Sequence, residues 1–375
     1  MGFAVRRVEY RNFRSYESFT LSDIGDLTII VGPNAVGKTN LIEGIQLTTA
    51  FHSFRSPKPH HLLAEGAKAG GIRLAVEDGE RRAEVELVLT PDSRTYRYNG
   101  KARRASSLQG IIPSVLFCPD DLELVKGPQS LRRLQADRLG CQLSANYRAV
   151  RRDYERVVRQ KNRCLKDGAS AAYLESLNEV VVAVGAQLYR LRLQLVEALA
   201  PCVSSAYAGL SQGRERISVG YCPSWFSPVS DQERETDFDP LSLDEARAAL
   251  ARGLESRFAE ERVRRTSLIG PHADRIEFYV NGRNARQFAS QGQQRSLVLS
   301  CKMAEVELFR DRLGVTPVLL LDDVMSELDE VRRAALLDLV SGGVQTFVTA
   351  TSMDYFAPCV EEAARVVRLE RGDRA

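Results

Sequence analysis

The segment GPNAVGKT, residues 32–39, constrains the fold of this 375-residue chain more than any other part of it. The apolar run LTIIV precedes it and the helical pattern NLIEGIQLTTAF follows, so the order is strand, glycine loop, helix. In that context GxxxxGK followed by Ser or Thr is a P-loop. Its backbone N–H groups can surround phosphates, Lys38 can reach the β and γ oxygens, and the Thr39 hydroxyl can bind Mg²⁺. The predicted nucleotide-binding residues are Gly32, Pro33, Asn34, Ala35, Val36, Gly37, Lys38 and Thr39.

A second apolar run, VLLLDD at residues 318–323, supplies the carboxylates that a P-loop site needs. Its hydrophobic residues fit a central buried strand, and the carboxyl ends of such strands are where α/β sheets bind ligands. We predict that Asp322 holds the hydration shell of Mg²⁺ and that Asp323 orients or deprotonates the attacking water. An Asp pair that only caps the next helix is the alternative, and we would prefer it if the chain had no P-loop.

The periodicity of the hydrophobic residues changes along the chain and predicts an inserted helical domain. Residues 71–104 alternate with period two, as in an antiparallel sheet. After Gly127-Pro128 the apolar residues step by three and four, first in one amphipathic helix and then, from Leu174 to Leu195, with coiled-coil spacing. The polar turn KDGAS joins the two helices. This pattern predicts a short antiparallel arm, and an ordinary helical subdomain is the alternative.

An α/β pattern returns after the helical region, so we expect a split α/β domain with a helical insertion. The first part of the α/β head, with the P-loop and the antiparallel subdomain, is predicted at residues 1–126. The helical arm domain is predicted at 127–262. The second part of the head is predicted at 263–375.

Composition limits where such a chain works. No apolar run approaches the roughly eighteen residues that a membrane span needs, and the N-terminus MGFAVRRVEY lacks the pattern of a secretion signal. We therefore expect a cytoplasmic protein with no membrane partner. The seven cysteines are nowhere spaced as CxxC, which argues against a disulfide framework or a zinc knuckle. A net charge of +3 is too small by itself to indicate a polyanionic partner.

The first predicted arm helix has a polar face that is rich in Arg and Lys and poor in acids. Such a face favours contact with phosphates, and a merely solvated charged face is the alternative. No base-reading motif is visible, so any DNA binding should depend on salt and have low sequence specificity. The DNA-binding candidates are Arg148, Arg152, Arg156, Arg159 and Arg163, and the same basic stretch also contains Arg132 and Lys161.

The stretch SQGQQRS, residues 290–296, has more hydrogen-bonding groups than the start of a helix needs. The spacing of the apolar residues that follow predicts a helix from about Gln293 to Asp311, with Ser290 at its N-cap or just before it. A serine, a glycine and free N–H groups at a helix start can form a second phosphate site. A simple N-cap, which one serine would satisfy, is the alternative.

Taken in order, these motifs resemble the ABC-type ATPases of the SMC class and, within that class, the RecF family of recombination mediators. The motifs that carry the resemblance are RNFR at 11–14, the P-loop at 32–39, PDDLELVKG at 119–127, GPH at 270–272, SQGQQR at 290–295 and LDDVMSELD at 321–329. They span nearly the whole chain. The resemblance implies an ATPase head with a mixed sheet around the P-loop, a short antiparallel coiled-coil arm, binding of ATP and Mg²⁺, and a role in DNA replication, DNA repair and the SOS response to DNA damage.

In ATPases of this type two heads pair head to tail, and each signature stretch closes over the γ-phosphate held by the other head. By resemblance, Ser290, Gly292 and Gln293 would act in trans, and Asp329 of the D-loop would lie at the dimer seam. The catalytic residues implied are Asp323, Lys38 and Ser290. The partners implied are a second copy of the chain in the presence of ATP, single-stranded or junction-containing DNA, and other recombination-mediator proteins.

The chain also departs from the usual patterns. ABC-type ATPases usually have Glu where Asp323 stands, and although the RecF family also uses Asp, the shorter carboxylate suggests slow hydrolysis. Thr351 occupies the switch position that is a histidine in transporters. The family usually has Arg-Asp-Asp after its GPH motif, whereas this chain has Ala273-Asp274-Arg275. This difference puts any function of the missing Arg and of the second Asp in doubt.

The leading hypothesis is therefore an ATP-gated dimeric clamp that binds DNA, assists recombinase loading and hydrolyses ATP weakly. A chromosome-structure ATPase of the SMC type is one alternative, but it would need arms of hundreds of residues. The ATPase subunit of a transporter is another, and it would need a switch histidine.

Overall fold

The computed structural model describes residues 2–226, 240–356, 360 and 364–370. By its internal contacts the chain forms two compact units. The head unit comprises Met1–Asp121 with Glu305–Ala375, and the inserted unit comprises Leu122–Ala304. These bounds differ from the predicted ones at 126/127 and 262/263, because residues 263–304 include a strand that pairs within the inserted unit. The domain boundaries themselves stay a prediction.

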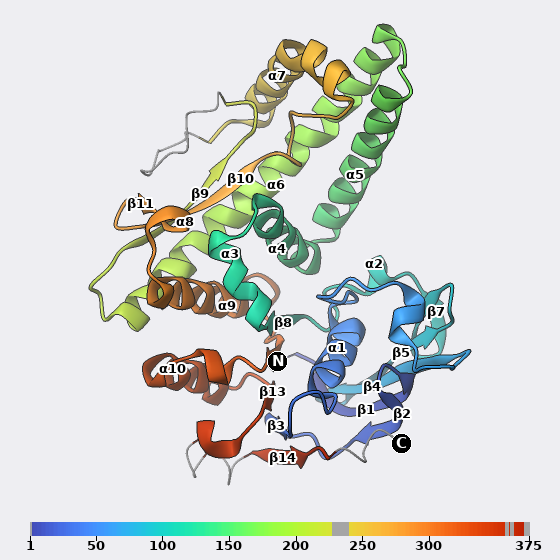
Figure 1. Ribbon diagram of the computed structural model, residues 1–375, viewed down its shortest axis with the longest axis vertical. Helices are drawn as coiled ribbons and strands as arrows, with labels where there is room; N and C mark the ends of the chain where they lie inside the picture. Colours follow the sequence, from blue (N-terminus) through green and yellow to red (C-terminus); the bar gives the residue numbers. More distant parts are fainter. Residues whose placement is uncertain (1, 227–239, 357–359, 361–363, 371–375) are drawn as a thin grey trace. The chain divides into compact units, whose positions relative to one another are not determined.

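Two sheets make up the head unit (Figure 1). The first is parallel, with the order β14-β3-β13-β12-β8. The second is antiparallel, with the order β2-β1-β4-β5-β6-β7. The strands are β1 (Ala4–Phe13), β2 (Tyr16–Leu21), β3 (Leu27–Val31), β4 (Gly70–Asp78), β5 (Arg81–Leu89), β6 (Arg94–Tyr98), β7 (Lys101–Arg103), β8 (Ser114–Phe117), β12 (Val318–Asp322), β13 (Thr346–Ala350) and β14 (Arg365–Arg368).

Helix α1 (Lys38–Thr49) contacts both sheets of the head unit and is buried along most of its length. A Cβ atom at Gly44 would lie 2.3 Å from the Tyr10 ring, so only glycine allows the helix to approach β1 this closely. All five residues of β3 are buried, as are those of β12 and β13, which explains why these strands are mostly apolar. The head unit also contains α10 (Glu330–Ser341).

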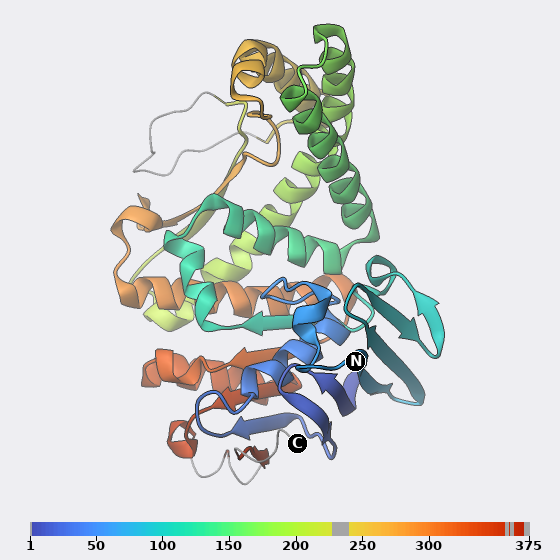
Figure 2. The same ribbon diagram turned by 45° about the vertical axis from the view of Figure 1, so that its right-hand side comes forward.

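The inserted unit is mostly helical and contains one small sheet. Helices α5 and α6 run side by side as a hairpin in both ribbon views (Figures 1 and 2). The sheet is antiparallel, with the order β11-β10-β9. The elements of the inserted unit are α3 (Glu123–Lys126), α4 (Gln129–Leu143), α5 (Ala145–Lys166), α6 (Ala171–Ser211), β9 (Ile217–Cys222), α7 (Leu243–Arg264), β10 (Arg275–Val280), β11 (Arg283–Asn284) and α8 (Ala285–Phe288). Helix α9 (Gln291–Leu313) also starts in this unit. The α/β class with a helical insertion and an antiparallel arm is confirmed.

The first predicted arm helix is two helices in the structure. Ser144 ends α4 and caps α5, because its hydroxyl accepts a hydrogen bond from the Tyr147 N–H. The apolar spacing runs through this break unchanged, so periodicity alone could not reveal it. Of the described helices, none is long and apolar enough to cross a membrane.

Buried charges join the helices of the inserted unit. The Asp137 carboxylate of α4 accepts hydrogen bonds from Tyr147 at 2.7 Å and from Arg192 at 2.8 and 2.9 Å. Lys161 is fully buried and lies 2.6 Å from Glu261. Burial opposes ionisation of Asp137, but the charge and hydrogen bonds of Arg192 lower its pKa below the ordinary value. These pairs hold α4, α5, α6 and α7 together.

Candidate nucleotide site

The site lies at one edge of the parallel sheet of the head unit. Strands β3, β13 and β12 are neighbours, and because all three are parallel their carboxyl ends meet at the same edge. The P-loop follows β3, Thr349 is near the end of β13, and Asp322 ends β12. Residues from the two ends of the chain therefore come together, as the sequence predicted for Thr39 and Asp322.

The P-loop is wrapped around the ammonium group of Lys38. The Lys38 Nζ donates to the carbonyl oxygens of Gly32 at 2.7 Å and Pro33 at 3.1 Å. Ala35 and Gly37 have positive φ angles of 64° and 114°, which turn the loop sharply before α1. Burial lowers the pKa of Lys38, and the charges of Asp323 and Asp322 act against that shift. In this structure the ammonium hydrogens of Lys38 are donated to loop carbonyls, and these same hydrogens could be donated to phosphate oxygens.

Asp322 is the centre of a hydrogen-bonded cluster beside the P-loop. Its Oδ1 accepts from the Thr39 hydroxyl at 3.0 Å and from the Thr349 hydroxyl at 2.9 Å. The Thr349 hydroxyl in turn accepts from the Asp323 N–H at 2.9 Å. The Asp322 side chain is 4% exposed, and burial raises its pKa, although the hydroxyls of Thr349 and Thr39 and the charge of Arg55 act in the opposite direction.

Thr349 is a site residue that the sequence reasoning missed. The reasoning singled out Thr351, which follows β13 and has no hydrogen bond among the described residues. Alternate residues of a strand point to the same face, so Thr349 and Thr351 share a face while Ala350 does not. In the parallel register Thr349 lies opposite Asp322, which brings the two side chains together. The alternation in TATS shows only that Thr349 and Thr351 share a face, and the register with β12 decides that Thr349 meets Asp322.

A second cluster supports the first turn of α1. The fully buried Glu43 accepts two hydrogen bonds of 2.9 Å from Arg14 and one of 2.5 Å from Ser53. Arg55 approaches Glu43 at 3.5 Å and donates to Asn40 at 3.1 Å. In the sequence, Arg14 stands out only as part of the RNFR motif at 11–14. Its partner Glu43 is 29 residues away along the chain, and no local pattern linked them.

The residues of the site fit a Mg²⁺ ion. Mg²⁺ prefers oxygen ligands and is usually bound by one or two protein groups together with phosphates and water. The Thr39 hydroxyl and the Asp322 carboxylate form such an oxygen pair, 3.0 Å apart, next to a phosphate-binding loop. The carboxylate is buried and has hydroxyl partners but no ion pair among the described residues, so it has unused capacity for a cation.

The stretch at residues 290–296 belongs to the inserted unit and forms a capping box. The Ser290 hydroxyl accepts from the Gln293 N–H at 3.2 Å, and the Gln293 side chain accepts from the Ser290 N–H at 2.7 Å. Gln293 also donates to Glu215 at 2.6 Å. Helix α9 starts at Gln291, two residues earlier than predicted, and Ser290 precedes it as expected. The exposed Ser290 and the half-buried Gly292 are at the surface of this unit.

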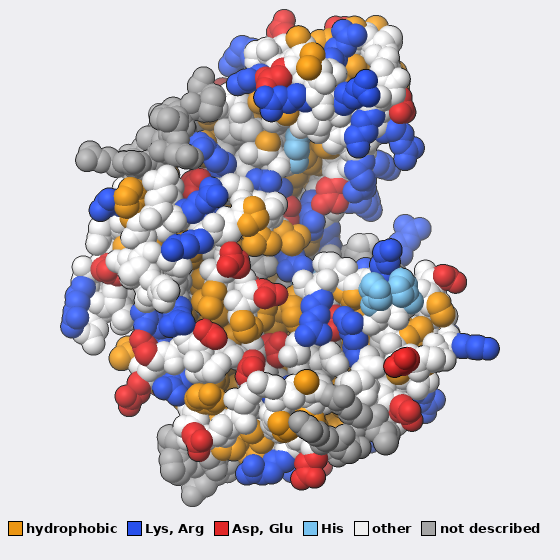
Figure 3. All heavy atoms as spheres, viewed as in Figure 1, with side chains coloured by type: hydrophobic (Ala, Val, Ile, Leu, Met, Phe, Trp, Pro, Cys, Tyr) orange, Lys and Arg blue, Asp and Glu red, His pale blue; other side chains and the backbone are white. Residues whose placement is uncertain are grey.

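Asp329 and the predicted DNA-binding residues have distinct local roles. Asp329 caps α10 by accepting a 3.0 Å hydrogen bond from the Arg332 N–H, and its side chain is 54% exposed. Lys and Arg side chains gather on the surface where α5 runs (Figure 3). Among the candidates, Arg152, Arg156, Arg159 and Arg163 are exposed, whereas Arg148 is half-buried and donates to the Cys141 carbonyl.

Two other residues of the basic stretch do not contribute to this surface. Arg132 is 2% exposed and pairs with Glu277 at 2.8 Å, and Lys161 pairs with Glu261 as described above. Including them in a basic face was wrong. Both have acidic partners more than 90 residues away, which the local charge pattern could not show.

The GPH motif is part of a buried network of the inserted unit. The Nδ1 atom of His272 lies 2.6 Å from the Tyr154 hydroxyl, and its Nε2 lies 3.1 Å from the Ser267 carbonyl. Asp274 binds the Tyr221 hydroxyl and the Ser224 N–H. Burial lowers the pKa of His272, so its neutral form is favoured. These contacts describe a structural network around the motif.

Comparison with known proteins finds relatives along the whole chain. The model of the RecF/RecN/SMC N terminal domain matches residues 4–374. The DNA replication and repair protein RecF of Symbiobacterium thermophilum is 38% identical over 349 residues, 91% of this chain and 90% of the relative. The protein of the same description from Thermosynechococcus vestitus is 34% identical over 374 residues, 98% of this chain and 96% of the relative. A solved structure of the recombination mediator protein RecF-ATP in the RecFOR pathway superposes with a TM-score of 0.85, at 26% identity, over 95% of this chain and 94% of that chain.

Proposed function

Since the chain belongs to the RecF family of ABC-type ATPases of the SMC class, we propose that it is an ATP-dependent DNA-binding protein of recombinational repair and replication. It forms a homodimeric clamp that closes when ATP binds, assists recombinase loading and opens after slow hydrolysis. The observation that carries this proposal is the cluster of Thr39, Asp322 and Thr349, which joins the two ends of the chain beside a P-loop.

Lys38 and the P-loop bind the phosphates of ATP. The Lys38 ammonium, which donates to two loop carbonyls, exchanges them for β and γ oxygens, and the N–H groups at the start of α1 add further donors. Thr39 and Asp322 hold Mg²⁺, which neutralises phosphate charge when it is bound. The raised pKa of Asp322 follows from its burial, and a cation at this position would favour the ionised carboxylate.

Asp323 acts on the attacking water. Its backbone has a left-handed φ of 54°, and its N–H donates to Thr349, so two constraints fix the direction of its side chain. A half-buried carboxylate in this position can accept a proton from water. Aspartate is one methylene shorter than the glutamate usual in ABC-type ATPases, and we infer weak hydrolysis that works as a timer.

Ser290 and Gly292 contact the nucleotide of a second copy of the chain. The Ser290 hydroxyl accepts a hydrogen bond within the capping box, and its hydrogen has no acceptor in the described part of the chain. It can therefore donate to a γ-phosphate brought by the partner. Both amide atoms of Gln293 are engaged, so we assign this residue to positioning Ser290. The exposed Asp329 lies at the same seam.

ATP controls dimerisation because it binds the closed dimer better than the separate monomers. A ligand that bridges two copies shifts the association equilibrium by the difference between its affinities for the two states. Hydrolysis removes the bridge. The four exposed arginines of α5 contact the phosphates of single-stranded or junction-containing DNA, and the other recombination-mediator proteins act with this chain.

Sedimentation with and without ATP tests the proposal. The wild-type chain should sediment as a dimer only with ATP, and Lys38→Met should stay monomeric because it does not bind ATP. Ser290→Arg should bind ATP yet stay monomeric, since the arginine fills the space of the partner's phosphate. Ser256→Arg places the same substitution on an exposed position of α7 and should behave as wild type.

Two outcomes would contradict the proposal. Association of all four proteins without ATP would show that nucleotide does not bridge the copies. Dimerisation of Ser290→Arg with ATP at the wild-type concentration dependence would remove Ser290 from the seam, even if the chain binds ATP as proposed.

A further inference from the structure

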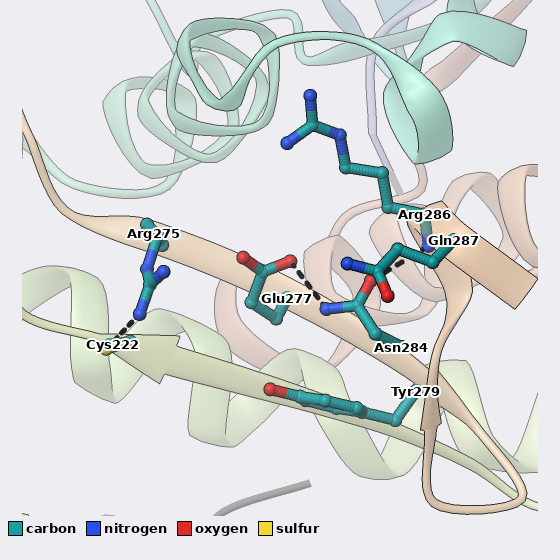
Figure 4. Close-up of a pocket in the computed structure, with 7 residues that line it drawn as sticks. All are labelled: Cys222, Arg275, Glu277, Tyr279, Asn284, Arg286 and Gln287. Carbon is teal, nitrogen blue, oxygen red and sulfur yellow. Dashed lines mark hydrogen bonds between the residues drawn. The ribbon is translucent and has the colours of Figure 1, made fainter. Parts of the chain in front are cut away.

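A polar cavity of about 230 Å³ lies on the small sheet of the inserted unit, next to α8 (Figure 4). Strands β9, β10 and β11 contribute to it together with α8. Pockets for drug-sized ligands measure roughly 300–1,000 Å³, so this cavity fits a small group. The residues that line it are Cys222, Arg275, Glu277, Tyr279, Asn284, Arg286 and Gln287.

The single carboxylate of the cavity is already neutralised. The Oε2 atom of Glu277 accepts from the buried guanidinium of Arg132 at 2.8 Å and from the Asn284 amide at 3.4 Å. Its Oε1 accepts from the Gln129 amide at 2.7 Å. Three donors therefore bind Glu277, and one of them is the cationic guanidinium of Arg132. The carboxylate holds Arg132 in place, and its single negative charge is balanced by that guanidinium.

Two further guanidinium groups at the cavity have no carboxylate partner. Arg275 is half-buried and donates only to the Cys222 sulfur at 3.4 Å, a weak acceptor. Arg286 is exposed on α8, and neither arginine is in an ion pair within the described ranges of the chain. In Figure 4 they come from opposite ends of the cavity, with Glu277 between them. Burial lowers the pKa of Arg132, the charge and hydrogen bond of Glu277 act against that shift, and the like charge of Arg286 adds to it more weakly.

The side chains at the cavity therefore carry an excess of two positive charges. The three guanidinium groups of Arg132, Arg275 and Arg286 outnumber the single carboxylate of Glu277. Two guanidinium groups close together repel each other. An anion bound between them offsets that repulsion, because each guanidinium then makes a charge-assisted hydrogen bond to the anion.

We propose that this cavity binds a phosphate group between the guanidiniums of Arg275 and Arg286. Arginine presents a planar fork of donors that matches the oxygens of a phosphate, and the side-chain amide of Gln287 adds a neutral donor. A phosphodiester of a DNA strand and free phosphate offer the same chemistry. The DNA source rests on the proposed DNA-binding function, whereas the free-phosphate source does not.

The test uses the full chain with the substitution Lys38→Met, so that phosphate binding at the P-loop does not contribute to the titration. Inorganic phosphate is titrated at constant ionic strength and followed by the broadening of its ³¹P resonance. A single-stranded oligonucleotide is titrated separately at low salt and followed by fluorescence anisotropy. Arg275→Asp, which reverses the charge at this position, and Arg286→Gln should each weaken phosphate binding by at least about tenfold. Arg252→Gln on an exposed position of α7 is the matched control and should change neither titration.

The results separate the two sources and can overturn the proposal. Loss of affinity for both ligands identifies a DNA phosphodiester, and loss for phosphate alone identifies a free phosphate. Unchanged binding of both ligands in Arg275→Asp and Arg286→Gln overturns the site. Because Arg286 is exposed, its substitution should leave the circular dichroism spectrum unchanged. ATP binding is measured separately in the same variants with Lys38 intact. Loss of ATP binding there would count against the proposed function and not against the phosphate site.

Discussion

At the scale of single residues, Asp322 is the group whose surroundings disfavour the charge that its function needs. It is a buried carboxylate with two hydroxyl donors and no fixed cation among the described residues. Burial disfavours its ionised form. The residue therefore reduces the stability of the free protein and recovers that loss when Mg²⁺ and nucleotide bind.

Asp322→Asn should stabilise the protein without ligands at neutral pH while abolishing Mg²⁺-dependent ATP binding. The amide oxygen of Asn can accept the same two hydroxyl hydrogen bonds and carries no charge. A carboxyl whose pKa is raised by folding binds a proton more tightly in the folded state, so its contribution to stability decreases as pH rises through its pKa. The thermal midpoint of Asp322→Asn should exceed that of wild type at pH 7, and the gap should close as the pH falls towards the ordinary pKa of a carboxyl group. A wild-type midpoint that is higher at every pH would refute the argument.

Thr349→Val should destabilise the protein far more than Thr351→Val. The first substitution removes the donor to Asp322 and the acceptor of the Asp323 N–H inside a buried cluster, which costs roughly 1–3 kcal/mol. Thr351 is half-exposed and has no hydrogen bond in the described part of the chain, so its change should stay within about 0.5 kcal/mol. Urea unfolding of both variants measures the difference. Equal losses would mean that the Thr349 hydroxyl does not support the site.

The sequence motifs predicted the parts of this site that lie within them. The motifs GPNAVGKT and VLLLDD each indicate the end of a strand and a side chain that can take part in a nucleotide site. In the structure the Thr39 hydroxyl donates a hydrogen bond to Asp322. Thr349 was missed because the sequence contains no information on the register between β12 and β13. The buried states of Arg132 and Lys161 were missed for a related reason: each depends on an acid brought near by the tertiary fold.

At the scale of secondary-structure elements, the hairpin of α5 and α6 was predictable and its details were not. Repeated steps of three and four define helices in water-soluble folds, and α6 was correctly expected around Leu174–Leu195. Its full length of 41 residues was not, since its continuation through Pro201 breaks the usual rule for helix interiors. The break at Ser144 depends on one capping hydroxyl, which leaves the apolar spacing intact.

Replacing the four exposed arginines of α5, Arg152, Arg156, Arg159 and Arg163, by Gln should weaken DNA binding and reduce its salt dependence. Each phosphate of single-stranded DNA that the protein no longer neutralises makes the slope of log K against log salt shallower by about 0.7. Arg148→Gln should have a smaller effect on that slope, because its guanidinium is turned to the Cys141 carbonyl. Fluorescence anisotropy over a range of salt concentrations gives the slopes.

A double substitution of Arg81 and Arg82 by Gln is the control for net charge. Both residues are exposed on β5 of the head unit and are already paired with acids. If this control reduces the salt dependence as much as the α5 variant does, the effect comes from overall charge and α5 has no special role.

At the scale of the whole molecule, the proposed clamp depends on hydrolysis to open. Asp323→Asn should therefore form dimers with ATP that persist, whereas wild-type dimers should decay as ATP is consumed. Asparagine tolerates the left-handed φ of 54° at this position better than most residues, so the substitution should not strain the backbone. Size-exclusion chromatography at successive times after a limited addition of ATP measures the decay. Equal lifetimes of the two dimers would show that Asp323 does not control opening.

The order of strands in the parallel sheet has a consequence for synthesis of the chain. Strand β3 ends at Val31, yet its two neighbours, β13 (Thr346–Ala350) and β14 (Arg365–Arg368), are made much later. A ribosome that adds about 5–20 residues per second therefore leaves this buried strand without its partners for on the order of half a minute. During that time the nascent P-loop cannot take its final shape. The chain can bind nucleotide only after β13 and Asp322 of β12 have been synthesised, and until then β3 is a segment that chaperones would have to shield.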